Sequence, residues 1–197
     1  MGTMKIRITF LEGLLGTAPG NEDVYREYIA SKSPDAATVE EEVAAVGVDE
    51  VVEKGTTIFP RTTEGAPFLY DYQIKGFFKD ACGMLSRVKT TESSKLKAYK
   101  KIIDGLIFVM PRQIPINAAG EISLCQRPLR AQTAQGERVA LSISEEAPVG
   151  TSIELEITLL DAAHEAAVRE WLDYGALRGI GQWRNSGKGR FSWEEIA

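Results

Sequence analysis

The amino-acid sequence predicts an α+β domain in which helices cover one face of an antiparallel sheet. Two segments, residues 4–11 and 151–159, alternate apolar and polar side chains as half-buried strands do. Between them, residues 73–87 repeat apolar side chains at helical spacing, which predicts an amphipathic helix. The chain has 197 residues, 44% of them hydrophobic, and is therefore long enough to bury one sizeable core.

Three further segments complete the order of elements. The apolar run that opens residues 106–116 predicts a central strand there. Residues 161–175 predict a helix capped by Asp161, and residues 188–196 predict the last strand. The order strand, helix, strand, strand, helix, strand is that of a ferredoxin-like (RRM-like) fold. We expect residues 1–197 to form a single domain of this kind.

An acidic insertion is expected over residues 20–70. It would contain helices over 21–30 and 38–53 and a small hairpin that turns at 62–65. Its carboxylates, which cluster between Glu40 and Glu53, are typical of a solvated helical surface or of a surface that binds a partner.

A protruding β-hairpin is expected from two strands over residues 122–133 and 138–144. Pro128 lies within the first of them and indicates an edge strand or a bulge, because proline cannot donate to a sheet. A lysine-rich helix is expected over residues 93–104.

The charges are unevenly distributed along the chain. The net charge is −5, yet residues 70–138 hold 12 Lys and Arg against 6 Asp and Glu. Affinity for phosphate depends on the local density of positive charge rather than on the net charge of the chain. Two arrangements are open: these cations form one basic face, or they lie scattered over unrelated surfaces. No apolar run is long enough to span a membrane, and Cys82 and Cys125 lack metal-ligand spacing. We expect a cytoplasmic protein with reduced thiols and no membrane association.

The segment Gly179–Phe191 combines glycines, cations and aromatic residues. Glycine allows a positive φ and close approach of a ligand to the backbone, and cations bind phosphates. Trp183 offers a flat face on which a base can stack. The segment is thus suited to a phosphodiester backbone, although a turn between a helix and a strand needs no ligand.

The order of residues in this segment, Gly-apolar-Gly, five residues, then Gly-x-Gly and an aromatic, resembles the C-terminal glycine-rich loop of the RAMP superfamily. These are the RNA-binding proteins of CRISPR effector complexes, and they have ferredoxin-like folds. The segment Ile74–Lys79 loosely resembles the start of their first core helix, although Phe77 and Phe78 replace the usual small hydroxyl residues. The predicted hairpin resembles in position their thumb-like protrusion.

The resemblance implies non-catalytic binding of single-stranded RNA, of the kind that carries a guide. The residues it implies for RNA binding are Lys75, Lys79, Arg127, Arg130, Gly179, Gly181, Trp183, Arg184, Gly187, Lys188, Gly189 and Arg190.

Two other functions remain open. The chain also looks similar to uncharacterised proteins encoded by phages and prophages. In that case the protein would be an antagonist or mimic of a CRISPR effector subunit. It would then bind the CRISPR ribonucleoprotein or self-associate into a filament. Alternatively, a metal-independent endoribonuclease would use His164, the only histidine, near Arg184 and Lys188. The helical register predicts an enclosed, structural His164, which disfavours catalysis. No metal-ligand spacing or phosphate-binding Gly-Lys-Ser/Thr loop is present in the sequence, and we expect no metal and no cofactor.

Overall fold

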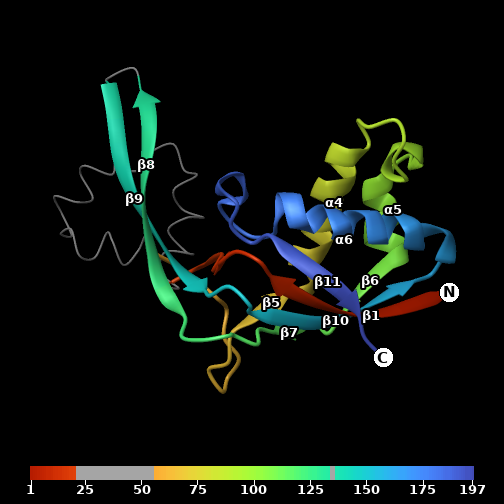
Figure 1. Ribbon diagram of the computed structural model, residues 1–197, viewed down its shortest axis with the longest axis horizontal. Helices are drawn as coiled ribbons and strands as arrows, with labels where there is room; N and C mark the ends of the chain where they lie inside the picture. Colours follow the sequence, from red (N-terminus) through yellow and green to blue (C-terminus); the bar gives the residue numbers. More distant parts are fainter. Residues whose placement is uncertain (21–55, 134–135) are drawn as a thin grey trace, which may run out of the picture.

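The sheet at the centre of the fold joins strands from both ends of the chain (Figure 1). A computed structural model describes residues 1–20, 56–133 and 136–197. The central sheet consists of β1 (Gly2–Phe10), β6 (Ile107–Met110), β10 (Ser152–Leu159) and β11 (Phe191–Glu195). These strands lie in the order β11-β1-β10-β6, and every neighbouring pair is antiparallel.

Strand β1 shows why the sequence pattern produces a one-sided sheet. Met4, Ile6, Ile8 and Phe10 are buried, whereas the residues between them face away from the core. On the opposite, open face Arg7 forms ion pairs at 2.8 Å with Glu154 of β10 and at 3.0 Å with Glu194 of β11. The charge of Arg7 on the open face is therefore paired across three strands.

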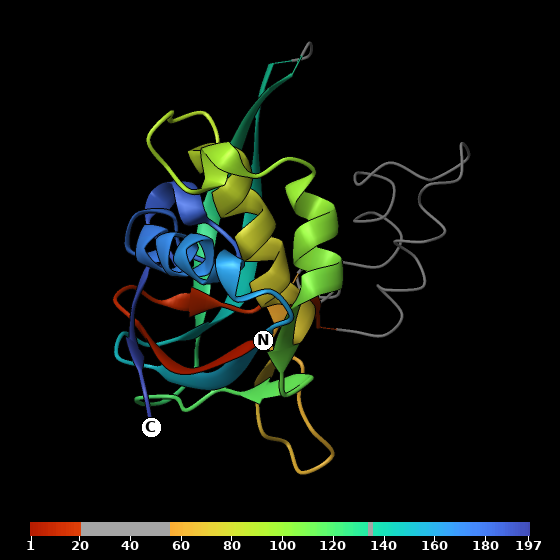
Figure 2. The same cartoon turned by 90° about the vertical axis from the view of Figure 1, so that its right-hand side faces the viewer.

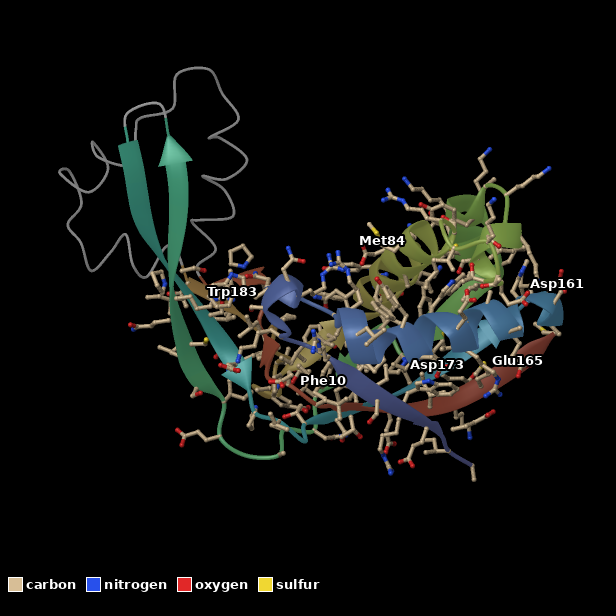
Figure 3. All side chains as sticks on the ribbon, turned by 45° about the horizontal axis from the view of Figure 1, so that its top comes forward. Phe10, Met84, Asp161, Glu165, Asp173 and Trp183 are labelled. Carbon is tan, nitrogen blue, oxygen red and sulfur yellow. The ribbon has the colours of Figure 1, made fainter. Side chains whose placement is uncertain are left out.

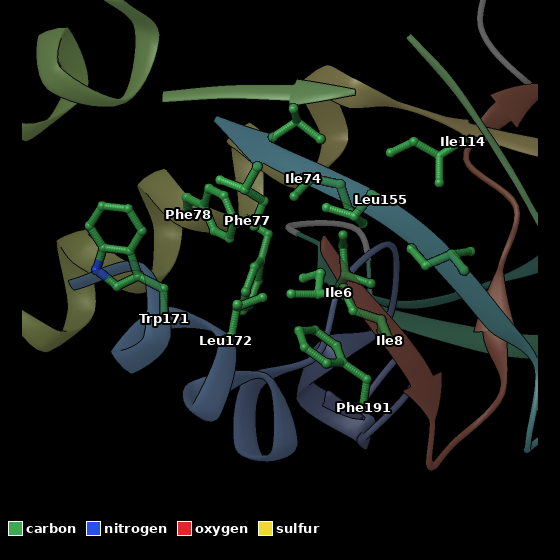
Figure 4. Close-up of a cluster of buried hydrophobic side chains, with 14 of the residues drawn as sticks. Ile6, Ile8, Ile74, Phe77, Phe78, Ile114, Leu155, Trp171, Leu172 and Phe191 are labelled. Carbon is green, nitrogen blue, oxygen red and sulfur yellow. The ribbon is translucent and has the colours of Figure 1, made fainter. Parts of the chain in front are cut away.

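Helices α4 (Asp71–Leu85) and α6 (Glu165–Arg178) pack on the other face, as Figure 2 shows. Phe77 of α4 meets Phe191 of β11 edge to face, with ring centroids 5.3 Å apart (Figure 4). Gly175 of α6 lies so close to the Phe191 ring that a Cβ atom on Gly175 would stand 2.1 Å from it. In chain order the core is β1, α4, β6, β10, α6 and β11, which is the α+β, ferredoxin-like arrangement that the sequence predicts.

Asp161 caps the start of the second helical segment as expected. Its Oδ1 accepts a hydrogen bond from Ala163 N at 3.0 Å. The first turn is the 3₁₀ helix η2 (Ala162–His164), and α6 continues from it to Arg178, three residues beyond the predicted end.

The predicted central strand over residues 106–116 is wrong in two respects. The chain forms two short strands instead, β6 and β7 (Gln113–Pro115), with Pro111 between them. β6 lies at the edge of its sheet, and only alternate residues of its apolar run are buried. β7 leaves that sheet and pairs with β5 (Phe68–Tyr70). An unbroken apolar run thus misled the prediction, because Phe108 and Met110 are exposed.

The predicted helix over residues 93–104 is also divided. It forms the 3₁₀ helix η1 (Ser93–Lys95) and the α-helix α5 (Tyr99–Leu106), because Ala98 between them has a left-handed φ of 53°. Ser93 fastens η1 to α6: its Oγ accepts from Trp171 Nε1 at 2.8 Å and donates to Glu170 at 2.6 Å.

The protruding hairpin is formed by β8 (Ser123–Thr133) and β9 (Gly136–Ala147), and it stands away from the helices in Figure 1. β8 pairs with β9 alone, so Pro128 lies in an edge strand as expected. Beyond its pairing with β8, β9 pairs with β2 (Leu14–Leu15) and β4 (Thr56–Ile58), and β4 pairs with β3 (Ala18–Pro19).

The small hairpin around residues 62–65 does not form. Its intended strands β4 and β5 pair with other strands. An isolated bridge between Arg61 and Pro67 closes the turn, together with backbone hydrogen bonds such as Phe68 N to Pro60 O at 3.0 Å. The helices expected over 21–30 and 38–53 lie outside the described residues. Among the residues that are described, no helix is long and apolar enough to cross a membrane.

Candidate nucleic-acid interface

The glycine-rich loop, residues 179–190, connects α6 to β11. Gly179, Gly181, Gly187 and Gly189 all have positive φ, between 71° and 91°. This region of backbone conformation favours glycine, since a Cβ atom is strained there. Trp183 adopts a φ of 57° without being glycine.

Two of the glycines allow the arms of the loop to touch each other. Ile180 N donates to Gly189 O at 3.0 Å, and Gly189 N donates to Gly13 O at 2.9 Å. A Cβ atom on Gly189 would lie 1.9 Å from Ile180 O, and one on Gly179 would lie 2.6 Å from Lys188 O. Gly179 and Gly189 therefore serve the closure of the loop rather than the approach of a ligand.

The outer part of the loop presents a run of peptide N–H groups. Those of Gly181 through Asn185 donate to no acceptor among the described residues. Successive unpaired N–H groups on a turn attract anions.

The residues that carry these N–H groups line an open pocket of about 760 Å³. Its other walls are the side chains of Arg127 and Ser142, from β8 and β9, and of Arg178 and Arg184, at the two ends of the turn that leaves α6. In Figure 3 Trp183 lies beside the hairpin, between β8 and the end of α6. The pocket thus lies where the β8–β9 hairpin meets the glycine-rich loop.

Arg127 is the most unusual residue of the pocket. It is 2% exposed, and its Cζ atom lies 3.4 Å from the centroid of the Trp183 ring. One terminal nitrogen donates to Ser144 Oγ at 3.1 Å and to Ser142 Oγ at 3.4 Å, whereas Nε and the other terminal nitrogen have no hydrogen-bond partner among the described residues. Burial lowers the pKa of Arg127, and nearby Cys125 and Glu146 oppose that shift.

Arg178 and Arg184 share one carboxylate. Asp80 Oδ2, from α4, accepts from Arg178 Nε at 2.9 Å and from Arg184 at 2.6 Å. Burial disfavours ionisation of Asp80, but the hydrogen bonds and charges of the two arginines outweigh it, so the pKa of Asp80 lies below its ordinary value. Arg178 also reaches Asn185 Oδ1 at 3.2 Å, which ties the helix end to the loop.

The two remaining cations of the loop differ in their partners. Lys188 forms an ion pair with Glu146 of β9, which links the loop to the base of the hairpin. Arg190 is exposed and forms no ion pair with any residue that the structure describes.

The structure brings together only part of the predicted RNA-binding set. Arg127, Gly181, Trp183 and Arg184 line the pocket, and Gly187, Lys188, Gly189 and Arg190 belong to the same loop. The side chain of Arg130 lies outside the described residues.

Lys75 and Lys79 do not line the pocket. They face α5, where Lys79 forms an ion pair with Asp104 at 2.6 Å and Lys75 donates to the backbone oxygen of Asp104 at 3.2 Å. The α4 residue that does reach the loop is Asp80.

The predicted set lacked Arg178, Asp80 and Ser142, and it also lacked three residues of the loop itself, Gln182, Asn185 and Ser186. Arg178 could have been identified from the sequence, because it is a cation in the last helical turn before Gly179. Asp80 and Ser142 had no such signal, because only the folded chain brings α4 and β9 to the loop.

His164 is not where an RNA-cleaving residue would be needed. It lies at the start of α6, where Figure 3 labels Asp161 and Glu165, whereas the loop follows the other end of that 14-residue helix, about 20 Å away. The expectation of an enclosed ring is also wrong, since His164 is half-buried. Within the described residues, no group of three or more His, Cys, Asp or Glu could hold a metal ion.

Comparisons with known proteins yield a structural likeness only. No protein-family model matches the chain, and no curated protein matches it. A chain of the cryo-EM structure of the type III-B Cmr-beta bound to cognate target RNA matches 99% of this chain, with a TM-score of 0.53 and 10% sequence identity. The match spans 58% of that longer chain. At this identity the likeness shows a shared fold and nothing more specific.

Proposed function

We propose that this protein binds single-stranded RNA, without cleaving it, in the pocket between the β8–β9 hairpin and the glycine-rich loop. The observation that carries the proposal is Arg127, a buried cation with two unpaired nitrogens and no carboxylate partner among the described residues. A buried charge without an ion-pair partner is costly to fold. The Trp183 ring offsets part of that cost, and the charge of an anion bound in the adjoining pocket would offset more of it.

The pocket suits a polynucleotide better than a small anion. Its volume of about 760 Å³ exceeds what one phosphate group fills, and Arg178 and Arg184 add two more cations to its wall. Arg127 covers one face of the Trp183 ring, and a base would stack on the other face. Unstacked bases are available in single strands, and contacts to phosphates make the binding tolerant of sequence.

The structural likeness supports the same class of ligand. The matched chain belongs to a complex that was determined with target RNA bound. The sequence of residues 179–191 resembles the glycine-rich loop of RNA-binding CRISPR proteins, and the structure places this segment between α6 and β11. RNA within a CRISPR-type ribonucleoprotein is therefore the partner that we propose.

Fluorescence anisotropy with a labelled oligouridylate tests the proposal. The double variant Arg184→Ala, Lys188→Ala should weaken binding by about tenfold or more, because charge-assisted contacts to phosphates contribute about 1.5–3 kcal/mol each. The matched control is Lys5→Ala with Arg169→Ala, which removes two cations outside the pocket and should leave the affinity within twofold. No binding by the wild type at low salt, or equal affinity of the loop variant, would refute RNA binding at this site.

One observation favours a second candidate, an antagonist or mimic of a CRISPR subunit that binds an assembled ribonucleoprotein. Asp80 and Glu146 already neutralise Arg178, Arg184 and Lys188, which reduces their attraction for free RNA. This candidate would be favoured over the first if the protein captures an intact ribonucleoprotein but does not bind free oligouridylate.

A further inference from the structure

The connection between α4 and α5 carries a second group of cations that the pocket does not use. Within residues 87–101 the only acidic residue is Glu92, and Lys95 pairs with it at 2.6 Å. The other five cations are all exposed, and their side chains form no ion pair or hydrogen bond with any described residue. We name them the lysine corner; they are Arg87, Lys89, Lys97, Lys100 and Lys101.

The lysine corner is built on a fixed scaffold. Glu170 of α6 accepts hydrogen bonds from the backbone N–H groups of Glu92 at 2.8 Å and Ser93 at 3.0 Å. Thr91 Oγ1 closes the preceding turn by donating to Leu85 O at 2.9 Å. The backbone between Lys89 and Lys97 is therefore anchored to both core helices, which fixes the turn from which these side chains extend.

Unpaired lysines of this kind fit a phosphate backbone better than a protein surface. Lysine is depleted at the centre of protein–protein interfaces, which are apolar, whereas nucleic-acid interfaces are strongly positive. Long, flexible ammonium side chains also adapt to phosphates without requiring a base sequence.

Helix α4 connects the region of the pocket to the lysine corner, because Asp80 lies on this helix and the corner follows its C-terminal end. Asp80, which holds Arg178 and Arg184 of the pocket, is five residues before Leu85, the last residue of the helix. That distance along the helix axis is about 8 Å, and the lysine corner begins directly beyond it.

We propose that the lysine corner is a second contact surface for the phosphate backbone of the nucleic-acid strand that enters the pocket. The proposal rests on the proposed RNA binding for the identity of the strand, and it adds where the strand continues. It also assigns a role to the excess of cations in the middle of the chain, which the paired Lys75 and Lys79 do not explain.

The salt dependence of binding tests this surface directly. Each lysine that contacts a phosphate of a single strand contributes about 0.7 to the slope of log affinity against log salt concentration. The corner variant Lys89→Gln, Lys97→Gln, Lys100→Gln, Lys101→Gln should therefore lower that slope by about 3, measured with an oligouridylate of about 20 nucleotides between about 50 mM and 200 mM salt. The same four positions changed to arginine should restore the slope, and Lys5→Gln on the open sheet face should leave it unchanged.

The outcomes separate this proposal from that of the pocket. An unchanged slope in the glutamine variant, with its thermal midpoint preserved, would overturn the lysine corner as a nucleic-acid surface. An unchanged RNA slope together with lost binding to polyglutamate would assign the corner to an acidic protein and would overturn the proposal equally. If the corner variant shows a smaller salt dependence of RNA binding while Arg184→Ala with Lys188→Ala binds normally, the proposal for the lysine corner is supported and the proposal for the pocket is refuted.

Discussion

Arg127 is the residue at which stability and binding oppose each other. A buried guanidinium with two unpaired nitrogens costs folding free energy, and an apolar side chain of similar length would relieve that cost. We expect Arg127→Met to raise the free energy of unfolding by about 1 kcal/mol or more, measured in urea. The same variant should lose about tenfold or more in affinity for oligouridylate, measured by anisotropy.

A matched control for Arg127 is Arg169 of α6, which pairs with Glu165 and Glu195 on the surface. Arg169→Met should change neither the RNA affinity nor the stability by more than about 0.5 kcal/mol. A marked loss of stability in Arg127→Met, with RNA affinity intact, would mean that the arginine is structural.

Asp80 competes with an incoming phosphate for Arg178 and Arg184. Asp80→Asn should increase the affinity for oligouridylate severalfold, because it removes the carboxylate that both guanidinium groups contact. Asp104→Asn, which removes the partner of Lys79 away from the pocket, is the control and should have no effect. Weaker binding by Asp80→Asn would show that the aspartate positions the arginines instead of masking them.

The lowered pKa of Asp80 also predicts a pH dependence of stability. Because its pKa is lower in the folded chain, the ionised carboxylate stabilises the fold fully above the unfolded value of about 3.9. This contribution disappears as the pH falls below about 4 and passes through the folded pKa. Urea unfolding should therefore show a difference between wild type and Asp80→Asn that shrinks at acid pH; a constant difference would contradict the assignment.

Single residues were predictable from the sequence where the signal is local. The cations and Trp183 of the glycine-rich loop stand together in the chain, and the structure keeps Trp183 and Arg184 at one pocket. Lys75 and Asp80 show the limit of such reasoning. The sequence favoured the lysine as the α4 contact, but which side of the helix meets the loop is decided by tertiary packing.

The glycine-rich loop, as an element, depends on contact between its two arms. Gly189→Ala should destabilise the protein by about 2 kcal/mol or more, since its Cβ would overlap Ile180 O at 1.9 Å and its φ is 71°. Gly187→Ala should cost only about 1 kcal/mol, because the atoms nearest its Cβ belong to the Arg190 side chain, 3.7 Å away. Thermal or urea unfolding of the two variants measures the difference. Equal costs would show that conformational strain, rather than closure of the loop, sets the requirement for glycine.

Elements with a clear period were predicted well, and elements defined by partners were not. The alternation in β1 and β10 and the apolar face of α4 correspond to strands and a helix close to the expected bounds. The segment 106–116 failed because Pro111 interrupts it and because an apolar run does not reveal whether a strand is central or at an edge. β4 and β5 failed as a hairpin because each finds its partner far along the chain.

The open face of the central sheet, opposite the helices, is an alternative surface for RNA, and we do not expect RNA to bind there. Arg7 is paired there with Glu154 and Glu194, which leaves Lys5 as the one unpaired cation of this face among the described residues of these strands. Lys5→Ser with Arg7→Ser should leave the affinity for oligouridylate within twofold by anisotropy. A tenfold loss would place the strand on the open sheet and not at the hairpin.

The central claim is that RNA lies between the hairpin and the glycine-rich loop. Photocrosslinking with an oligouridylate that contains 5-iodouridine, followed by mass spectrometry of the peptides, tests it most directly because it reports position. We expect crosslinks at Trp183 of the loop, lost in Trp183→Leu and reduced in Arg127→Met. Crosslinks confined to peptides of β1 and β10, with none in the loop or the hairpin, would contradict it.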